Sequence, residues 1–352
     1  MPDFTGAGDM NKSCHPKNLA MSKVQIRIED QQNEVADEVS ALLAVVRPIL
    51  SGILFSLKAD VVGEAGGFDQ VKLKMLTRLY KRGDGDCGIC FEYAVHDAML
   101  RGEASVLERV SDGLKRCKVP GNDHASILFG AEKNGATSII ATAEATLTSD
   151  SRILTGERHQ PPKLKSYLNR LAAAFRRPTT RPALPYSING LWKADLFLGT
   201  TDGDRWVGTS VKINAKQLEG ANGLRVGIVP CRQGRSDGIH KIEAKNLIVC
   251  PIPYDGEFME IFYQAWGLVQ QFIFADAKMP SEVNLPISSH RQVVSELVAR
   301  REHPVVEVVD ALIPIAQPGL LKTVEETKTI FQRGELEPLL SGIIMPVPNL
   351  NP

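Results

Sequence analysis

The sequence predicts an α/β fold, in which a mixed central sheet is flanked by helices, and three observations support this prediction. Residues 192–214 contain an apolar run, a polar turn and a second apolar run, which is typical of two strands joined by a turn. Two further apolar runs, 224–230 and 246–252, have the length of strands. Elsewhere, apolar residues recur at the three- and four-residue spacing of amphipathic helices.

The N-terminal part is expected to be helical after a polar tail. Residues 1–22 are rich in Gly, Asp, Asn, Lys and Pro, which predicts a disordered segment. The apolar spacing of 33–56 predicts a helix interrupted near Pro48, because proline lacks the N–H that a helix interior uses. A second helix with a solvated basic face is expected at 68–82, and a third at 88–101.

The middle of the chain is predicted to hold short strands and one helix. The apolar runs 126–129 and 137–143 predict a β-hairpin with its turn at 133–135. Residues 161–175 have helical spacing. The Arg- and Pro-rich residues 176–185 that follow are expected to be a linker.

The C-terminal part is predicted to be helical. Residues 256–274 form a long amphipathic pattern rich in aromatic side chains, which is more typical of a core helix than of an interface. Further helices are expected near 291–301 and 320–333. The domain organisation that follows is an α/β domain over 23–280 and a small helical extension over 281–352.

Composition describes an ordinary globular protein and gives little direct information about partners. The 352 residues are 43% apolar and 23% charged, and 41 basic residues balance 41 acidic ones. There is therefore no global basic field of the kind that marks a DNA-coating protein, although a local basic groove remains compatible. The apolar runs are too short for a membrane span, and the N-terminus is unlike a secretory signal. Six cysteines do not suggest a disulfide scaffold, so a cytoplasmic location is expected.

The most informative residues are Asp195 and Lys212, on the two predicted strands of residues 192–214. Ser210 and Lys212 are two residues apart, so their side chains point to the same side of the second strand. A carboxylate beside an ammonium group can hold a divalent metal next to a positive charge. This arrangement suits phosphodiester cleavage, because both charges stabilise the negative charge that develops in the reaction.

The predicted helix 88–101 adds a second carboxylate. Phe91, Val95 and Met99 are spaced four residues apart and form an apolar stripe, and Glu92 lies at its edge. An acid at the edge of a packing face is partly desolvated, so a nearby cation would stabilise it.

Together these residues resemble the motif of the PD-(D/E)xK nuclease superfamily, which includes restriction enzymes and Holliday-junction nucleases. The pattern Gly-x-x-Phe-Glu-x-x-Val starts at Gly88, and an Asp–Ser-x-Lys pattern follows at Asp195 and Lys212. The resemblance covers about residues 84–275 and implies a restriction-endonuclease-like fold. It also implies that Glu92 and Asp195 hold Mg²⁺ or Mn²⁺ and that Lys212 orients the attacking water.

The sequence departs from the family pattern in three places. Ala194 replaces a proline that often precedes the aspartate, which is a common variation. Ser210 replaces the usual acid two positions before the lysine, and a hydroxyl is a poorer Mg²⁺ ligand than a carboxylate. Glu219, the next acid along the chain, is the candidate for the missing ligand, with Ser210 in a supporting position. The long interval after Glu92 implies an insertion at about 103–180.

The resemblance implies a metal-dependent DNA endonuclease, in a restriction or anti-phage defence setting. Cutting both strands would require two active sites and hence a homodimer. The chain lacks the Gly-x4-Gly-Lys-[Ser/Thr] motif, so ATP-driven translocation or sensing would need a partner protein. A locally basic segment could contact the DNA backbone, although a solvated loop explains it nearly as well. Its candidate residues are Arg225, Arg232, Arg235 and Lys241, with His240 beside them.

Other interpretations of the same residues stay open. Cys87 at a helix start, followed by His124 and Asp150, has the order found in papain- and transglutaminase-like cysteine hydrolases. Cys87 and Cys90 form a Cys-x-x-Cys pair, but no second pair completes a zinc site, so packing is the expected role. Asp195 and Lys212 could also form an ordinary cross-strand salt bridge, and Ser210 is compatible with an inactive nuclease-fold interaction module.

Overall fold

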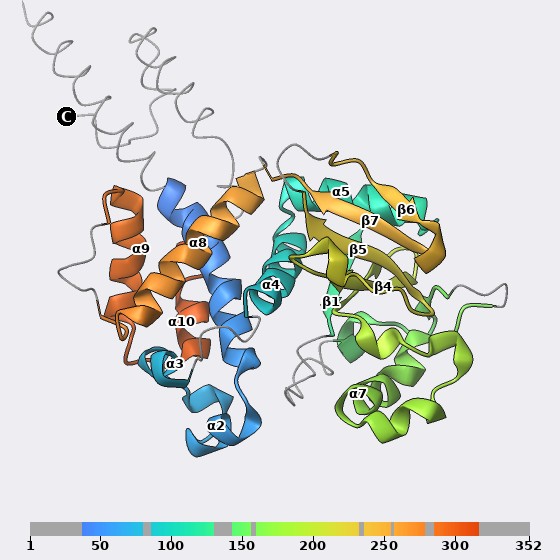
Figure 1. The fold of residues 1–352 in the computed structure, drawn as a ribbon, viewed down its shortest axis with the longest axis horizontal. Helices are drawn as coiled ribbons and strands as arrows, with labels where there is room; N and C mark the ends of the chain where they lie inside the picture. Colours follow the sequence, from blue (N-terminus) through green and yellow to red (C-terminus); the bar gives the residue numbers. More distant parts are fainter. Residues whose placement is uncertain are drawn as a thin grey trace, which may run out of the picture. The chain divides into compact units, whose positions relative to one another are not determined.

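The structure is a computed structural model, and it describes residues 37–79, 86–129, 143–155, 160–231, 236–254, 257–278 and 285–316. Within these residues the chain forms an open sheet of seven strands with helices around it, which confirms the predicted α/β class (Figure 1). The sheet and the helices that cover it belong to one compact unit, Val39–Leu321.

The sheet is mixed, as predicted. Its strands are β1 (His124–Leu128), β2 (Arg152–Ile153), β3 (Leu196–Thr200), β4 (Arg205–Val211), β5 (Leu224–Pro230), β6 (His240–Ile242) and β7 (Leu247–Ile252). The order is β1-β3-β4-β5-β7-β6, and β2 pairs with β4 outside this path. β3 and β4 are antiparallel, whereas β4, β5 and β7 are parallel. The carboxyl ends of β4, β5 and β7 therefore lie at one edge of the sheet.

Most predicted strands are present, with changed bounds or partners. The hairpin of 192–214 is β3 and β4, and β5 has the predicted bounds. β1 begins two residues earlier than predicted and pairs antiparallel with β3. Its expected hairpin partner, 137–143, and the turn at 133–135 lie outside the described residues, except for Ala143, which is helical. The short edge strand β6 was not predicted, because its three residues are mostly exposed and show no apolar alternation.

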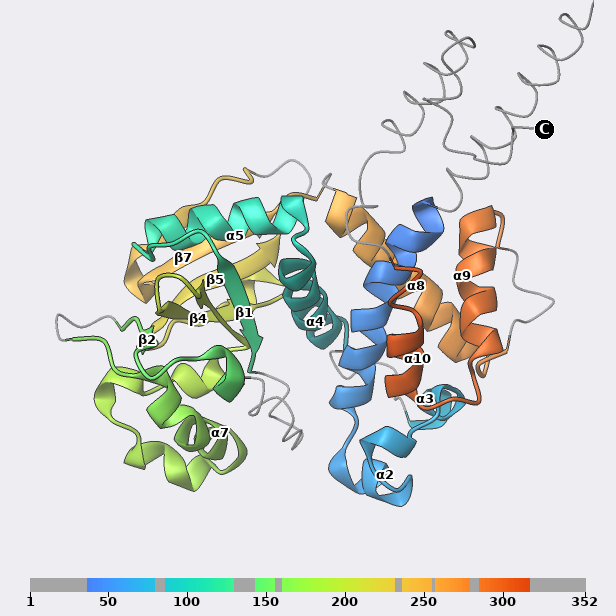
Figure 2. The same ribbon diagram turned by 180° about the vertical axis from the view of Figure 1, so that it is seen from behind.

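Two helices pack against the sheet from one side. α4 (Asp86–Arg101) contacts β1, and α5 (Ala104–Arg116) contacts β7. Figure 2 shows α5 lying across the part of the sheet formed by β5 and β7. α5 packs against Cys250 of β7, whose thiol donates to the carbonyl of Arg109. Both α5 and β1 come from the segment 103–180, so part of the expected insertion contributes to the central sheet and its cover.

The other face of the sheet is covered by residues between β2 and β3. The helix predicted at 161–175 is a 3-10 helix, Leu164–Tyr167, followed by α7 (Leu168–Arg176). Buried leucines of both segments join one apolar core with Phe197 of β3 and Trp206 of β4.

The expected linker at 176–185 is a packed part of this layer, which corrects the prediction. Residues Pro178–Ala183 form a 3-10 helix, and the guanidinium of Arg181 lies 3.7 Å from the ring centroid of Trp192. Arg181 Nε also donates to the carbonyl of Ala174, 3.0 Å away. The cation–π contact and this hydrogen bond hold a proline-containing segment that looks like a spacer in sequence.

The remaining described helices come from both ends of the chain. They are the N-terminal helix Asp37–Ser56, α2 (Ala59–Glu64), α3 (Leu73–Leu79), α8 (Glu257–Phe274), α9 (Ser288–Ala299) and α10 (Val305–Ala311). α8 agrees with its prediction, and α10 was not predicted. α3 begins at Leu73 and not at residue 68, where a 3-10 helix (Phe68–Gln70) lies instead, and the predicted residues 80–82 lie outside the described residues. The helix expected at 320–333 lies outside the described residues. α9 contacts α8, and Arg47 Nε of the N-terminal helix donates to the carbonyl of Val309 in α10.

The N-terminal helix runs through Pro48, so the predicted interruption is wrong. A proline inside a helix costs about 3 kcal/mol. Here the apolar side chains before and after it, including Val46, Ile49 and Leu50, are fully buried, and that burial offsets the cost. By length and composition the helix could span a membrane, which the sequence analysis did not expect. However, 78% of its most apolar window is buried inside the protein, as in the core helix of a soluble protein, so this is weak evidence for a span.

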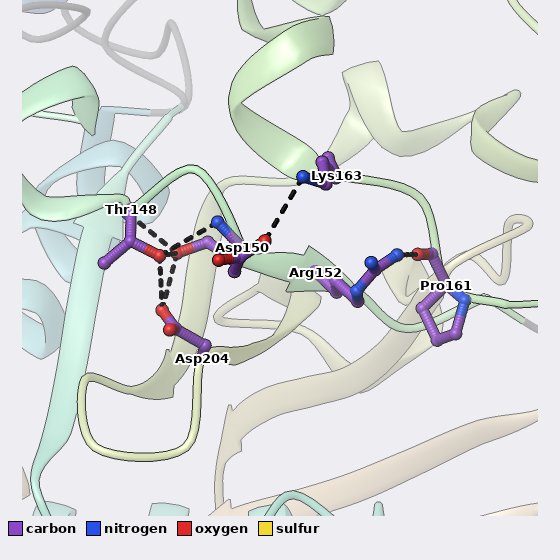
Figure 3. A network of polar contacts seen from close by, with 7 residues as sticks. Thr148, Asp150, Arg152, Pro161, Lys163 and Asp204 are labelled. Atoms are coloured by element: carbon purple, nitrogen blue, oxygen red, sulfur yellow. Dashed lines mark hydrogen bonds and ion pairs between the residues drawn. The ribbon is translucent and has the colours of Figure 1, made fainter.

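A polar network joins the β3–β4 turn to the turn before β2 (Figure 3). The carboxylate of Asp204 accepts hydrogen bonds from the hydroxyls of Thr148 and Ser151, both at 2.9 Å. Nearby, Lys163 Nζ donates to Asp150, 3.2 Å away. Asp204 has a φ of 49°, which aspartate tolerates better than most residues. Its side chain and its backbone conformation therefore both serve to fix this corner of the sheet.

Replacing Asp204 with alanine is expected to lower the free energy of unfolding by about 1 kcal/mol, because two hydroxyls lose their acceptor and alanine is strained at positive φ. Asp204→Asn keeps an acceptor and tolerates this conformation, so it should lose less than half as much. Urea denaturation of the three proteins measures the difference. Equal stability of the wild type and Asp204→Ala would contradict this role.

Candidate active site at the edge of the sheet

The structure brings Glu92, Asp195 and Lys212 together, as the sequence analysis proposed. Glu92 lies in α4, Asp195 directly precedes β3, and Lys212 directly follows β4. The ammonium nitrogen of Lys212 is 3.0 Å from Glu92 Oε1 and 2.6 Å from Asp195 Oδ2. One cation thus bridges two carboxylates that come from a helix and a neighbouring strand.

The position of Asp195 is fixed by the sheet's backbone hydrogen bonds. Its N–H donates to the carbonyl of Thr209, and its own carbonyl accepts from the N–H of Phe129, both at 2.9 Å. Its carboxylate oxygen Oδ2 accepts from the backbone N–H of Val211 at 2.9 Å and from the hydroxyl of Ser210 at 3.3 Å. The carboxylate is therefore held in place even before the contact with Lys212 is considered.

The site is partly shielded from water. Asp195 is 1% exposed, Glu92 is 5% exposed, and 26% of the Lys212 side chain is exposed. Burial by itself lowers the pKa of Lys212, but the attraction of the Glu92 and Asp195 carboxylates outweighs this effect and raises the pKa above the ordinary lysine value. Lys212 is consequently a permanent cation at neutral pH.

The donor set fits Mg²⁺ with a small number of protein ligands. Among the described residues, no group of three or more His, Cys, Asp or Glu side chains has the arrangement of a metal site. Mg²⁺ usually keeps several waters and binds through one or two carboxylates plus substrate phosphates. The carboxylates of Glu92 and Asp195 match this usual type and number of protein ligands.

Glu219, the candidate third ligand, faces a different partner. Its carboxylate accepts from Lys193 Nζ at 2.6 Å, and 68% of its side chain is exposed. The hydrogen bond and charge of Lys193 lower the pKa of Glu219, and the charge of Lys212 adds only a small effect in the same direction. The structure thus does not join Glu219 to the two buried carboxylates.

The backbone N–H of Val211 was not identified from the sequence, whereas His96 was expected on the helix surface and instead faces β1. The backbone N–H of Val211 binds Asp195, as described above, and backbone groups leave no signal in residue types. His96, one turn after Glu92, is packed against β1, and its Nδ1 lies 2.9 Å from the hydroxyl of Ser126. Burial lowers the pKa of His96 to about 4, although Asp97 opposes the shift, so this imidazole is neutral near pH 7.

The basic segment is only partly described. Arg225 donates to the carbonyl of Thr155, and Lys241 donates to Glu243 Oε2 at 2.7 Å. Arg232 and Arg235 lie outside the described residues. Both described candidates thus already have partners within the protein.

The structure does not bring Cys87 and His124 together as a hydrolase pair. Lys212 links Glu92 of α4 to Asp195, and the carbonyl of Asp195 accepts from the N–H of Phe129, just after the end of β1. His96 of the same helix lies beside Ser126, nearer the start of β1. Cys87 therefore lies beyond the Phe129 end, and His124 lies at the other end of β1. The nine steps along the helix from Cys87 to His96 alone correspond to about 14 Å. Cys90 is buried and its thiol donates to the carbonyl of Ile49, in agreement with a packing role.

Comparisons with protein-family models, with curated proteins and with solved structures find no match to this chain.

Proposed function

We propose that the protein is a Mg²⁺-dependent endonuclease that hydrolyses phosphodiester bonds of DNA, with a restriction-endonuclease-like core of the PD-(D/E)xK type. The observation that carries the proposal is the position of Lys212, whose ammonium group contacts both Glu92 and Asp195 at the sheet edge. The sequence resemblance rests on a helix acid, an acid at the start of one strand and a lysine at the end of the next, and the acid that is usual two residues before the lysine is replaced by Ser210.

In the proposed mechanism, Glu92 and Asp195 would hold the metal, which would supply Lewis-acid activation of the attacking water. The N–H of Val211 and the hydroxyl of Ser210 keep the Asp195 carboxylate oriented. Lys212 orients the attacking water and stabilises the negative charge that develops on the phosphoryl oxygens. Its pKa, raised by the two carboxylates, suits it to act as a fixed charge and not as a general base.

The substrate and partners follow from the same proposal. Double-strand cleavage would be carried out by a homodimer that places one site on each strand. A partner protein would supply any ATPase or sensing step. A restriction or anti-phage defence role is the biological setting associated with this type of nuclease, and it rests on that association alone.

The proposal predicts that purified protein cuts plasmid DNA with Mg²⁺ or Mn²⁺ and not with EDTA. Asp195→Asn should reduce cleavage by at least about 100-fold, a change of about 2.7 kcal/mol in the barrier, because it removes a metal-binding charge but keeps an acceptor for the Val211 N–H. Asp112→Asn, an exposed residue of α5 paired with Lys115, is the matched control and should cut like the wild type. Equal cleavage by wild type and Asp195→Asn would reject the proposed site.

A catalytically inactive module with the same fold is the second candidate, and two observations favour it. Ser210 stands where the family pattern has an acid, and the described residues offer no third carboxylate at the site. Binding of a metal by the folded state raises the melting temperature by mass action. A folded protein that shows neither cleavage nor Mn²⁺-dependent stabilisation would therefore support the inactive module.

A further inference from the structure

A pocket of about 270 Å³ lies at the carboxyl edge of the sheet, beside the chain segment that follows Lys212. We call it the edge pocket; the residues that define it here are Ile213, Ala215, Val229, Ile242, Val249 and Pro251. Ile213 directly follows Lys212, so the backbone of the pocket wall begins about 3.8 Å from the backbone of the catalytic lysine. β5 and β7 form its floor through Val229 and Val249, whereas α5 packs against Cys250 on the other face of these strands.

The chemistry of the edge pocket changes from floor to mouth. Val229 and Val249 are almost fully buried and give it an apolar floor. Lys216 and His240 are exposed and lie at its mouth. Among the described residues, no acidic side chain lines it. A ligand that fits has an uncharged, largely apolar ring system that enters the pocket and a negative charge that stays outside.

The volume limits the size of this ligand. Pockets for drug-sized ligands begin at roughly 300 Å³, so the edge pocket suits one small ring system. Enzymes that act on nucleic acids hold an extruded base between apolar or aromatic side chains, and a histidine can stack on a base. In a nucleotide the phosphate is attached through the sugar, away from the base. The base would therefore contact the apolar floor while the phosphate stays at the mouth beside Lys216.

We propose that the edge pocket binds one nucleobase of the DNA, unpaired or extruded, next to the phosphate held at Lys212. This inference rests on the proposed function, because it names the kind of DNA that the nuclease would prefer. Extruding a base costs a few kcal/mol, and the cost is lowest where the base is mismatched, damaged or already single-stranded. The expected substrates are therefore single-stranded or locally distorted DNA.

The test uses mononucleotides, so that it does not depend on cleavage. The full-length protein is heated in EDTA with each of the four deoxynucleoside 5′-monophosphates, at concentrations on the order of 1–10 mM. Deoxyribose 5-phosphate is the probe that lacks a base. At least one nucleotide should raise the melting temperature in a concentration-dependent manner, and deoxyribose 5-phosphate should not.

Two alanines provide a matched pair of variants. Ala215 and Ala244 are both exposed and both lie in short 3-10 helices, η7 (Ala215–Gln217) and η8 (Glu243–Lys245), but only Ala215 lines the edge pocket. Ala215→Trp should raise the half-saturating nucleotide concentration by at least about tenfold, whereas Ala244→Trp should behave like the wild type. Ser236→Trp, at an exposed position on the pocket lining, is the second blocking variant.

Three results would overturn the inference. They are the lack of stabilisation by any nucleotide, equal stabilisation by deoxyribose 5-phosphate, and unchanged binding in both blocking variants. Nucleotide binding without DNA cleavage would support the assignment of the edge pocket and contradict the proposed nuclease activity. DNA cleavage without nucleotide binding would support the proposed nuclease activity and contradict the assignment of the edge pocket.

Discussion

Replacing Lys212 with methionine is expected to abolish DNA cleavage and to lower the free energy of unfolding by about 3 kcal/mol. Methionine fills a similar volume but leaves the carboxylates of Glu92 and Asp195 without the cation between them. Removing one partner of a buried ion pair costs about 3–5 kcal/mol, and the 26% exposure of Lys212 places the effect at the lower end. Urea denaturation and plasmid cleavage measure the two losses.

Two further variants separate the effect of the Lys212 charge on stability from the role of its ammonium group in cleavage. Lys212→Arg keeps a positive charge between the carboxylates, so it should recover much of the stability. Its planar, broader head group should not recover cleavage, because it cannot occupy the compact position of the ammonium. Lys115→Met removes an exposed lysine that pairs with Asp112, and it should change stability by less than about 1 kcal/mol. Wild-type stability of Lys212→Met would show that the bridge contributes nothing.

The contribution of Lys212 to stability should also depend on pH. Its pKa is raised above the ordinary lysine value of 10.5, so the folded state binds the proton more tightly than the unfolded state. The stabilisation is therefore fully present below pH 10.5 and is lost as the pH rises through the higher folded pKa. The stability difference between wild type and Lys212→Met should remain constant near neutral pH and shrink only in strong alkali. A difference that shrank between pH 7 and 9 would contradict this assignment.

The candidate site could be predicted because its parts leave local signals. Asp195 and Lys212 flank two strands joined by a short turn, and strand alternation indicates which side chains share a face. Glu92 stands at the edge of an apolar stripe, which shows that its helix packs there. That these three side chains meet was inferred from a family resemblance, since no local pattern links α4 to the hairpin.

The parts that could not be predicted depend on tertiary contacts. Glu219 is near Lys212 in sequence, but its carboxylate pairs with Lys193, which lies before β3, and residue spacing does not indicate this partner. Pro48 has a strong local preference against helix, which the surrounding buried side chains overcome. Arg181 lies in a segment with the composition of a linker and is held by Trp192, a residue of the 3-10 helix Leu191–Lys193.

Gly52 provides a second test, because the N-terminal helix and α4 meet there. A Cβ atom at Gly52 would lie 2.9 Å from Cys90 Cα and 3.2 Å from Cys90 N. Backbone atoms cannot swing aside as a side chain can, so Gly52→Ala must push the two helices apart. We expect a loss of about 2–3 kcal/mol in the free energy of unfolding, near the upper end of the range for overpacking.

The same substitution at Gly267 should change the free energy of unfolding in the opposite direction. Gly267 lies within α8, and no atom outside its own helix and neighbours stands within 4 Å of the position that a Cβ atom would take there. Alanine at Gly267 should stabilise the protein by about 0.5–1 kcal/mol, because it reduces the backbone freedom of the unfolded chain. Thermal unfolding of both variants gives the comparison, and a stabilising Gly52→Ala would contradict the close helix contact. Cys90 is two residues before Glu92, so Gly52→Ala should also weaken cleavage by displacing Glu92 from Lys212, whereas Gly267→Ala should leave cleavage unchanged.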